Sequence, residues 1–223
     1  MPKPNAIFCE FLGTLLLVVV ASSAAVANMA AGGQALWAEA LANGLAVALI
    51  VTATLGISGG QINPAVTLGL LSIGKVGRTE AAVFIAAQVA GAACGGWLIR
   101  QFLPVETAQQ CLYGTPVLYK DLPVYMGVLF EVLATMVLCA SIWITVLHPS
   151  KPHKNGFGIG ATVACMIYLF GPLTGAAMNP ARQLGSAFAA GYWADHWLYW
   201  AGPVAGAVLG LQLFGWIFKR IAK

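Results

Sequence analysis

The sequence predicts an all-α membrane protein with six transmembrane helices plus two re-entrant half-helices in an inverted repeat. Three observations predict it. Of the 223 residues, 60% are hydrophobic and only 8% are charged, whereas soluble domains carry about 25% charged residues. The few charges separate long apolar runs, and the two halves of the chain share motifs in the same order. This composition excludes nucleic-acid binders, ordinary cytosolic enzymes and disordered modules.

Six apolar runs are each long enough to cross the ~30 Å hydrocarbon core as a helix. They cover residues 7–31, 37–57, 81–99, 122–147, 155–181 and 197–218. The first run is longer than the apolar core of a signal peptide and is followed by five more, so we expect it to be a retained span.

Two shorter apolar pieces, residues 64–73 and 180–190, are about half a span long. Each begins with proline directly after asparagine. Short hydrophobic segments in corresponding positions of two halves indicate broken helices that line a transport site. We therefore expect two half-helices that enter the membrane without crossing it.

Basic residues predict the orientation, because lysine and arginine concentrate in cytoplasmic loops. With six spans, one side receives Lys3, Lys75, Arg78, Lys151, Lys154, Lys219, Arg220 and Lys223. The opposite side receives only Arg100 and Lys120. We expect an integral protein of the plasma (inner) membrane with both termini in the cytoplasm.

The chain reads as one domain over residues 1–223, built from repeats at approximately 1–104 and 121–223. Three motifs recur: residues 10–14 resemble 131–135, residues 58–65 resemble 174–181, and residues 88–92 resemble 203–207. A repeat with an odd number of spans places its second copy upside down in the bilayer. The two half-helices then enter from opposite faces and meet near the midplane.

Asparagine followed by proline has a specific meaning at a helix start. Asparagine is a strong N-cap, and proline suits the first helical position because its missing N–H costs nothing there. Each helix start carries about +0.5 elementary charge. The motifs Asn63-Pro64-Ala65 and Asn179-Pro180-Ala181 therefore predict two positive helix ends with amide donors facing a passage. Water can pass such a site, whereas cations are repelled and proton wires are interrupted.

On these motifs the chain resembles the aquaporin, or major intrinsic protein, family over essentially its whole length. The matching segments are residues 58–67, 87–91 and 178–182, together with Glu10 and Glu131. The resemblance implies a homotetramer in membrane lipid, with one pore per subunit that passively conducts water or small neutral solutes. It implies no enzyme activity, cofactor, metal or nucleic-acid partner. The sequence also shows no Ser/His/Asp set, metal cluster or phosphate loop.

The resemblance also assigns a selectivity filter around Arg182, which follows the second motif by one residue. Matching from the two asparagines gives Asn43 on the second span, Ile167 on the fifth span and Ala176 in the second loop. The fifth-span position depends on how Pro172 aligns, so Met166 or Tyr168 remain alternatives there.

Glu10 and Glu131 are buried acids by the span assignment. The resemblance suggests that they accept hydrogen bonds from loop amides and brace the half-helices. A proton-relay role is the alternative.

The expected solutes are water and somewhat larger neutral polyhydroxy compounds: glycerol, urea, and boric, silicic or arsenous acid. The fifth span contains no histidine, and no acid follows Arg182 until Asp195. Small Ala176 and mid-sized Asn43 and Ile167 should leave a wide, less aromatic constriction. The alternatives are a strictly water-selective aquaporin and a secondary transporter with broken helices, which would need Glu10 or Glu131 for ion coupling.

Two features outside the filter remain open. His148 and His153 bracket the loop between the fourth and fifth spans. We expect a plain solvated loop there, with a pH- or ligand-gated lid as the alternative. Cys111 lies in the long connection after the third span, where we expect a free thiol, with pairing across subunits as the alternative.

Overall fold

The computed structural model describes residues 1–148 and 154–221, and within them the regular secondary structure is helical. Six helices in this part of the chain are long and apolar enough to cross a membrane. They are α1 Pro4–Ala30, α2 Leu36–Thr54, α4 Arg78–Phe102, α6 Val124–Ile142, α7 Phe157–Thr174 and α9 Leu198–Ile221. Helix α6 continues into one π-helical turn, Trp143–Leu147. The predicted fold class is therefore confirmed. The loop residues Lys151 and His153, and the terminal Lys223, lie outside the described residues.

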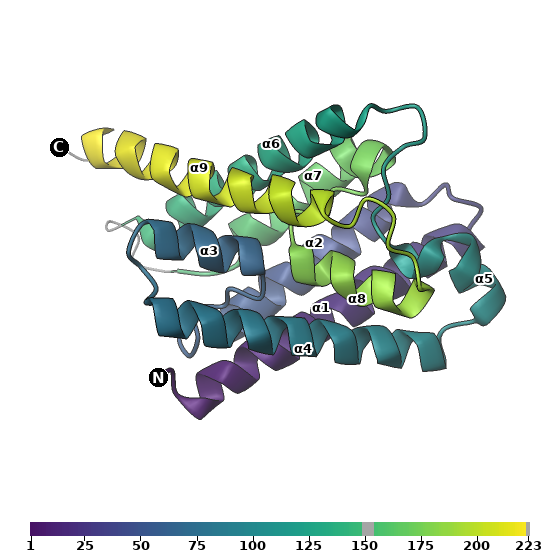
Figure 1. Ribbon diagram of the computed structural model, residues 1–223, viewed down its shortest axis with the longest axis horizontal. Coiled ribbons are helices and arrows are strands. Elements are labelled where there is room, and N and C mark those ends of the chain that lie inside the picture. The colour runs from purple at the N-terminus through teal and green to yellow at the C-terminus, as the bar shows by residue number, and fades with distance from the viewer. Residues whose placement is uncertain (149–153, 222–223) are drawn as a thin grey trace.

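The two half-helices are α3 Pro64–Ser72 and α8 Pro180–Ala190. They lie between the long helices, α3 toward the end where α1 begins and α8 toward the end that holds the short helix α5, Val105–Gln110 (Figure 1). Helix α1 begins and α9 ends at the same end of the molecule (Figure 1). Since α1 begins and α9 ends there, the chain runs from end to end of the bundle an even number of times. The two half-helices lie on opposite sides of the centre of the molecule (Figure 1).

One predicted helix end was wrong. The apolar run 155–181 is helical only to Thr174, and residues 175–179 form a loop before α8. Gly175 ends α7 in the left-handed conformation, with φ 78°, which glycine adopts at no steric cost. Composition could not indicate this end, because the loop is as apolar as the helix before it.

Glycines allow the long helices to pack closely. A Cβ on Gly91 of α4 would overlap the carbonyl of Phe11 on α1, and a Cβ on Gly206 of α9 would overlap that of Val132 on α6. Gly44 and Gly160 meet in the same way where α2 crosses α7. Small residues let helix backbones approach in lipid. Glycine therefore allows close packing both of α1 with α4 and of the equivalent pair in the second half, α6 with α9.

Candidate functional site

Asn63 and Asn179 cap the two half-helices. The Asn63 Oδ1 accepts the N–H of Ala65 at 2.9 Å. The Asn179 Oδ1 accepts the N–H groups of Ala181 at 3.0 Å and Arg182 at 3.3 Å. Both asparagines have extended backbones, and a proline opens each helix. The capping geometry expected from the sequence is present at both helix starts.

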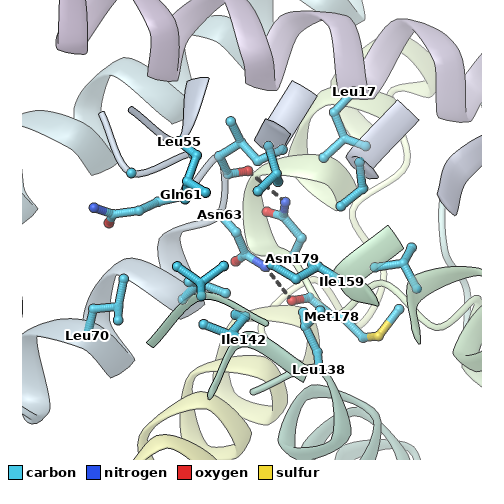
Figure 2. A pocket seen from close by; sticks show the side chains of 18 of the residues that line it. Leu17, Leu55, Gln61, Asn63, Leu70, Leu138, Ile142, Ile159, Met178 and Asn179 are labelled. Atoms are coloured by element: carbon cyan, nitrogen blue, oxygen red, sulfur yellow. Dashed lines mark hydrogen bonds between the residues drawn. The ribbon is translucent and has the colours of Figure 1, made fainter. Parts of the chain in front are cut away.

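The same two side chains link the half-helices to each other. The Asn63 Nδ2 donates to the carbonyl of Met178 at 2.8 Å, and the Asn179 Nδ2 donates to the carbonyl of Ile62 at 2.9 Å. Figure 2 shows the two amides side by side with these reciprocal bonds. We expected both amides to donate into the passage. Because each amide has two N–H bonds and one is used across the interface, a single N–H per asparagine is left for a solute.

Glu10 holds the first loop from behind. Its carboxylate accepts the Ser58 hydroxyl at 2.6 Å and the N–H groups of Gln61 at 3.0 Å and Ile62 at 2.6 Å. The Gln88 Nε2 donates to it as well, at 2.7 Å. A buried carboxylate needs such donors to offset its lost hydration. The carboxylate fixes the loop that leads into Asn63.

Glu131 holds the second loop in the equivalent way. It accepts the Thr174 hydroxyl at 2.8 Å and the N–H groups of Ala177 at 2.9 Å and Met178 at 2.8 Å. Both glutamates are fully buried, and neither is among the residues that line the central cavity. This geometry is that of a brace. It does not suit a proton relay, because neither carboxylate contacts the passage.

A cavity of about 350 Å³ passes between the half-helices and joins the predicted site residues. Asn63 and Asn179 lie within its wall, and toward one end it is lined by Asn43, Ile167, Ala176 and Arg182. The other end is lined by Lys75, Glu80 and Lys154. Between these ends the wall is mainly aliphatic, as Figure 2 shows around the two asparagines.

Among the three alternatives for the fifth-span position, the structure brings Ile167 to the cavity. This side chain lines the cavity, whereas Met166 and Tyr168 are not among the lining residues. Tyr168 is 57% exposed on the outside of the bundle. The helical rotation of α7 therefore separates the three alternatives that the sequence left open, and it places the aliphatic one against the passage.

Arg182 is buried, and its guanidinium is held by a residue that the sequence did not indicate. Its Nη1 donates to the carbonyl of Gly114 at 2.7 Å. Gly114 follows α5 at the end of a 3₁₀ turn, Leu112–Gly114, and has a φ of 70°. Its tight packing against Ala25 leaves no room for a Cβ. The available signal was a glycine in the long loop, but the sequence could not show that it lies beside Arg182.

Asn43 reaches the cavity from α2. It is buried, and its Nδ2 donates to the carbonyl of Glu39 one turn earlier, at 2.8 Å. One of its two N–H bonds is used by its own helix, so Asn43 keeps one N–H donor and the amide oxygen as an acceptor for a solute. This end of the cavity thus presents an acceptor at Asn43 as well as the donor Arg182.

The described residues contain no group of three or more His, Cys, Asp or Glu side chains that could hold a metal ion. The polar groups that line the cavity are amides, the Ser58 hydroxyl, backbone atoms, two lysines, one glutamate and one arginine. This set can exchange hydrogen bonds with a passing neutral molecule. The Ser58 hydroxyl donates to Glu10, whose carboxylate also accepts the loop N–H groups, so this hydroxyl is part of the brace and the arrangement supports passage of a neutral molecule.

Comparison with known proteins agrees with this geometry. A family model described as "Major intrinsic protein" matches residues 2–214. Aquaporin TIP4-4 from Zea mays is 39% identical over 227 aligned residues, covering 96% of this chain and 86% of the relative. Aquaporin-2 from Homo sapiens is 34% identical, covering 98% of this chain and 80% of the relative. The X-ray structure of the aquaglyceroporin from Plasmodium falciparum is similar with a TM-score of 0.81 and 28% identity, covering 97% of this chain and 96% of that one.

Proposed function

The chain belongs to the major intrinsic protein family, which consists of membrane channels and not enzymes, and from this premise we propose its solute range. The channel conducts water and larger uncharged solutes with several hydroxyl or amide groups. Glycerol, urea, and boric, silicic and arsenous acids belong to this class. The name of the similar aquaglyceroporin structure supports a range wider than water.

The observation that carries this proposal is the set of side chains at the end of the cavity that holds Arg182. Asn43, Ile167, Ala176 and Arg182 line it, and none of them is aromatic. Ala176 contributes a single methyl group, and Ile167 stands where a larger ring would narrow the passage. Because a hydrophobic opening cannot strongly reject a molecule smaller than its width, water should pass together with the larger solutes.

Hydrogen-bonding groups select for neutral polar molecules. Arg182 offers donors and Asn43 offers an acceptor at one end, and the remaining N–H bonds of Asn63 and Asn179 face the middle. A solute with hydroxyl groups can replace its lost water contacts with these groups in turn. A cation meets Arg182 and then two positive helix ends, and the single Asn43 acceptor cannot replace its hydration shell against this positive charge.

Stopped-flow light scattering on proteoliposomes tests the proposal. We expect fast water flux together with glycerol and arsenous acid entry well above that of empty liposomes. Ile167→His should narrow the opening and reduce glycerol entry more than water flux. Tyr168→His is the matched control, because Tyr168 lies on the same helix and points away from the cavity. Fast water flux with glycerol and arsenous acid both excluded would instead show a strictly water-selective channel.

The bracing glutamates argue against the second alternative, a secondary transporter. Glu10 and Glu131 would have to bind a coupling ion, yet the donors described above already occupy both carboxylates and neither lines the cavity. Flux that rises linearly with solute concentration fits a channel. Saturable uptake driven by an ion gradient would favour a transporter.

We further propose that the chain forms one domain over residues 1–223 and assembles as a homotetramer with a pore in each subunit. We place it in the plasma membrane with both termini in the cytoplasm. The predominance of basic residues at the end where α1 begins supports this orientation.

A further inference from the structure

The residue four positions after each capping asparagine is held by a side chain from outside its half-helix. In α3 this residue is Thr67, whose Oγ1 accepts a hydrogen bond from Gln88 Nε2 of α4 at 3.0 Å. In α8 it is Gln183, whose Oε1 lies 2.5 Å from His196 Nδ1 in the turn before α9. Thr67 and Gln183 are both fully buried. The two half-helices are thus held at equivalent places, the first by an amide and the second by an imidazole.

The neighbours of His196 determine which nitrogen of its neutral ring carries the proton. The Trp200 Nε1 lies 3.1 Å from His196 Nε2. An indole N–H is a donor only, so His196 Nε2 must be the acceptor. The proton of the neutral ring is then on Nδ1, which donates to Gln183 Oε1. Trp193 packs edge-on against the same ring, with centroids 5.1 Å apart.

We propose that His196 is the positioning residue of α8, and that its protonation makes permeability depend on the pH outside the membrane. Gln183 directly follows Arg182 in the first turn of α8. The Gln183 Nε2 is buried without a hydrogen-bond partner, so the bond from His196 holds this side chain. The inference rests on conduction by the channel and not on its solute range.

Protonation adds a hydrogen to Nε2, so that two donors face each other and the Trp200 bond is lost. The ring then moves away from Trp200 while its Nδ1–H stays bonded to Gln183, so the Gln183 side chain moves with it and the first turn of α8 beside Arg182 is displaced. Burial lowers the pKa of His196, so the change occurs at a more acidic pH than for an ordinary histidine. Permeability should be high near neutral pH and fall as the outside becomes acidic.

Other ionisable groups lie on the elements around His196. They are Tyr192 and Asp195 in its own turn, Arg182 on α8, Tyr199 on α9 and Arg100 in the last turn of α4. The Arg182 guanidinium is bonded to the Gly114 carbonyl, and the Tyr199 hydroxyl donates to the Thr174 carbonyl. Removing the imidazole alone separates its titration from that of these groups.

The test measures water permeability and tryptophan fluorescence of proteoliposomes between about pH 8 and about pH 5, the range in which histidine titrates. We expect the wild-type permeability to fall several-fold in one acidic step. His196→Gln should remove the step. Trp200→Phe should move the midpoint to higher pH, because protonation then breaks no bond. His148→Gln is the control and should keep the wild-type step, since His148 lies after α6 in a different loop.

A step of wild-type size in His196→Gln would overturn the inference. So would constant wild-type permeability across a pH range in which the fluorescence shows that His196 titrates. The fluorescence midpoint does not require conduction. A protein that conducts nothing would therefore contradict the proposed function, while an unchanged midpoint in Trp200→Phe would separately overturn the present inference.

Discussion

At the scale of single residues, Glu10 shows how a carboxylate can lie in an apolar bundle. It is fully buried and accepts hydrogen bonds from one hydroxyl, two backbone N–H groups and one amide. An ionised group in low dielectric is tolerated only when it is paired in this way. The carboxylate also has a structural role, because its two oxygens hold the loop before Asn63.

Replacing Glu10 with glutamine should destabilise the protein strongly. The new NH₂ group would face N–H donors, and the loop would lose one of its two acceptor oxygens. Breaking a buried charged network typically costs about 3–5 kcal/mol. Thermal unfolding of the detergent-solubilised protein checks this, with the exposed Glu106→Gln as the control. Equal melting temperatures for the two variants would show that Glu10 is not a brace.

Cys111 should react slowly with thiol reagents at neutral pH. Its Sγ lies 3.6 Å from the Thr107 carbonyl and 3.5 Å from that of Ala108, and burial raises the pKa of the thiol. The thiolate is the reactive form, so alkylation should accelerate as the pH rises. A membrane-impermeant maleimide with mass spectrometry measures the rate, and Cys111→Ser identifies the signal. Labelling as fast as in the denatured chain would contradict the burial.

At the scale of elements, close contacts between helix backbones depend on particular glycines. Gly91→Ala should destabilise the protein, because the added Cβ meets the Phe11 carbonyl and α1 must move. Overpacking costs about 1–3 kcal/mol. Gly171→Ala on α7 is the matched control, since its Cβ would meet only ordinary contacts and alanine favours a helix by about 1 kcal/mol. Of the wild type and the two variants, Gly91→Ala should have the lowest melting temperature. The reverse order would show that α1 and α4 adjust freely.

The sequence predicted which elements exist better than where they end or what they touch. Sparse charges separated the six long helices, and the two Asn-Pro pairs located the starts of α3 and α8. The end of α7 was missed because Glu131, more than forty residues earlier, takes the N–H groups of Ala177 and Met178 out of the helical pattern. The anchor of Arg182 at Gly114 was missed for a similar reason, since these residues meet only after the chain folds.

At the scale of the whole molecule, the two halves combine into one electrostatic barrier. Each half-helix contributes about +0.5 elementary charge at its start, and the reciprocal bonds of Asn63 and Asn179 hold these starts together. Neither half alone places a positive end on both sides of the passage. We therefore expect ion exclusion to be a property of the assembled repeat.

Asn63→Asp should let cations pass. The substitution keeps the cap acceptor and the shape of the side chain but places a negative charge between the two positive helix ends. Sodium and proton flux into proteoliposomes under an imposed potential should rise several-fold above wild type. Asn5→Asp adds the same charge at the start of α1, outside the cavity, and should change nothing. Cation exclusion that survives Asn63→Asp would locate the barrier elsewhere, with Arg182 as the remaining candidate.

The distribution of basic residues should set the orientation of the whole bundle. Lys75 and Lys154 line the cavity at one end, whereas Arg100 closes α4 at the other. Because basic loops stay in the cytoplasm, reporters fused to either terminus should be active only inside the cell. Changing Lys75 and Arg78 together to glutamine should produce a fraction of inverted molecules. Changing Arg100 to glutamine should produce none, since it removes charge only from the outer side. External reporter signal from the wild-type protein would reverse the assignment, and His196 would then respond to the pH of the cytoplasm.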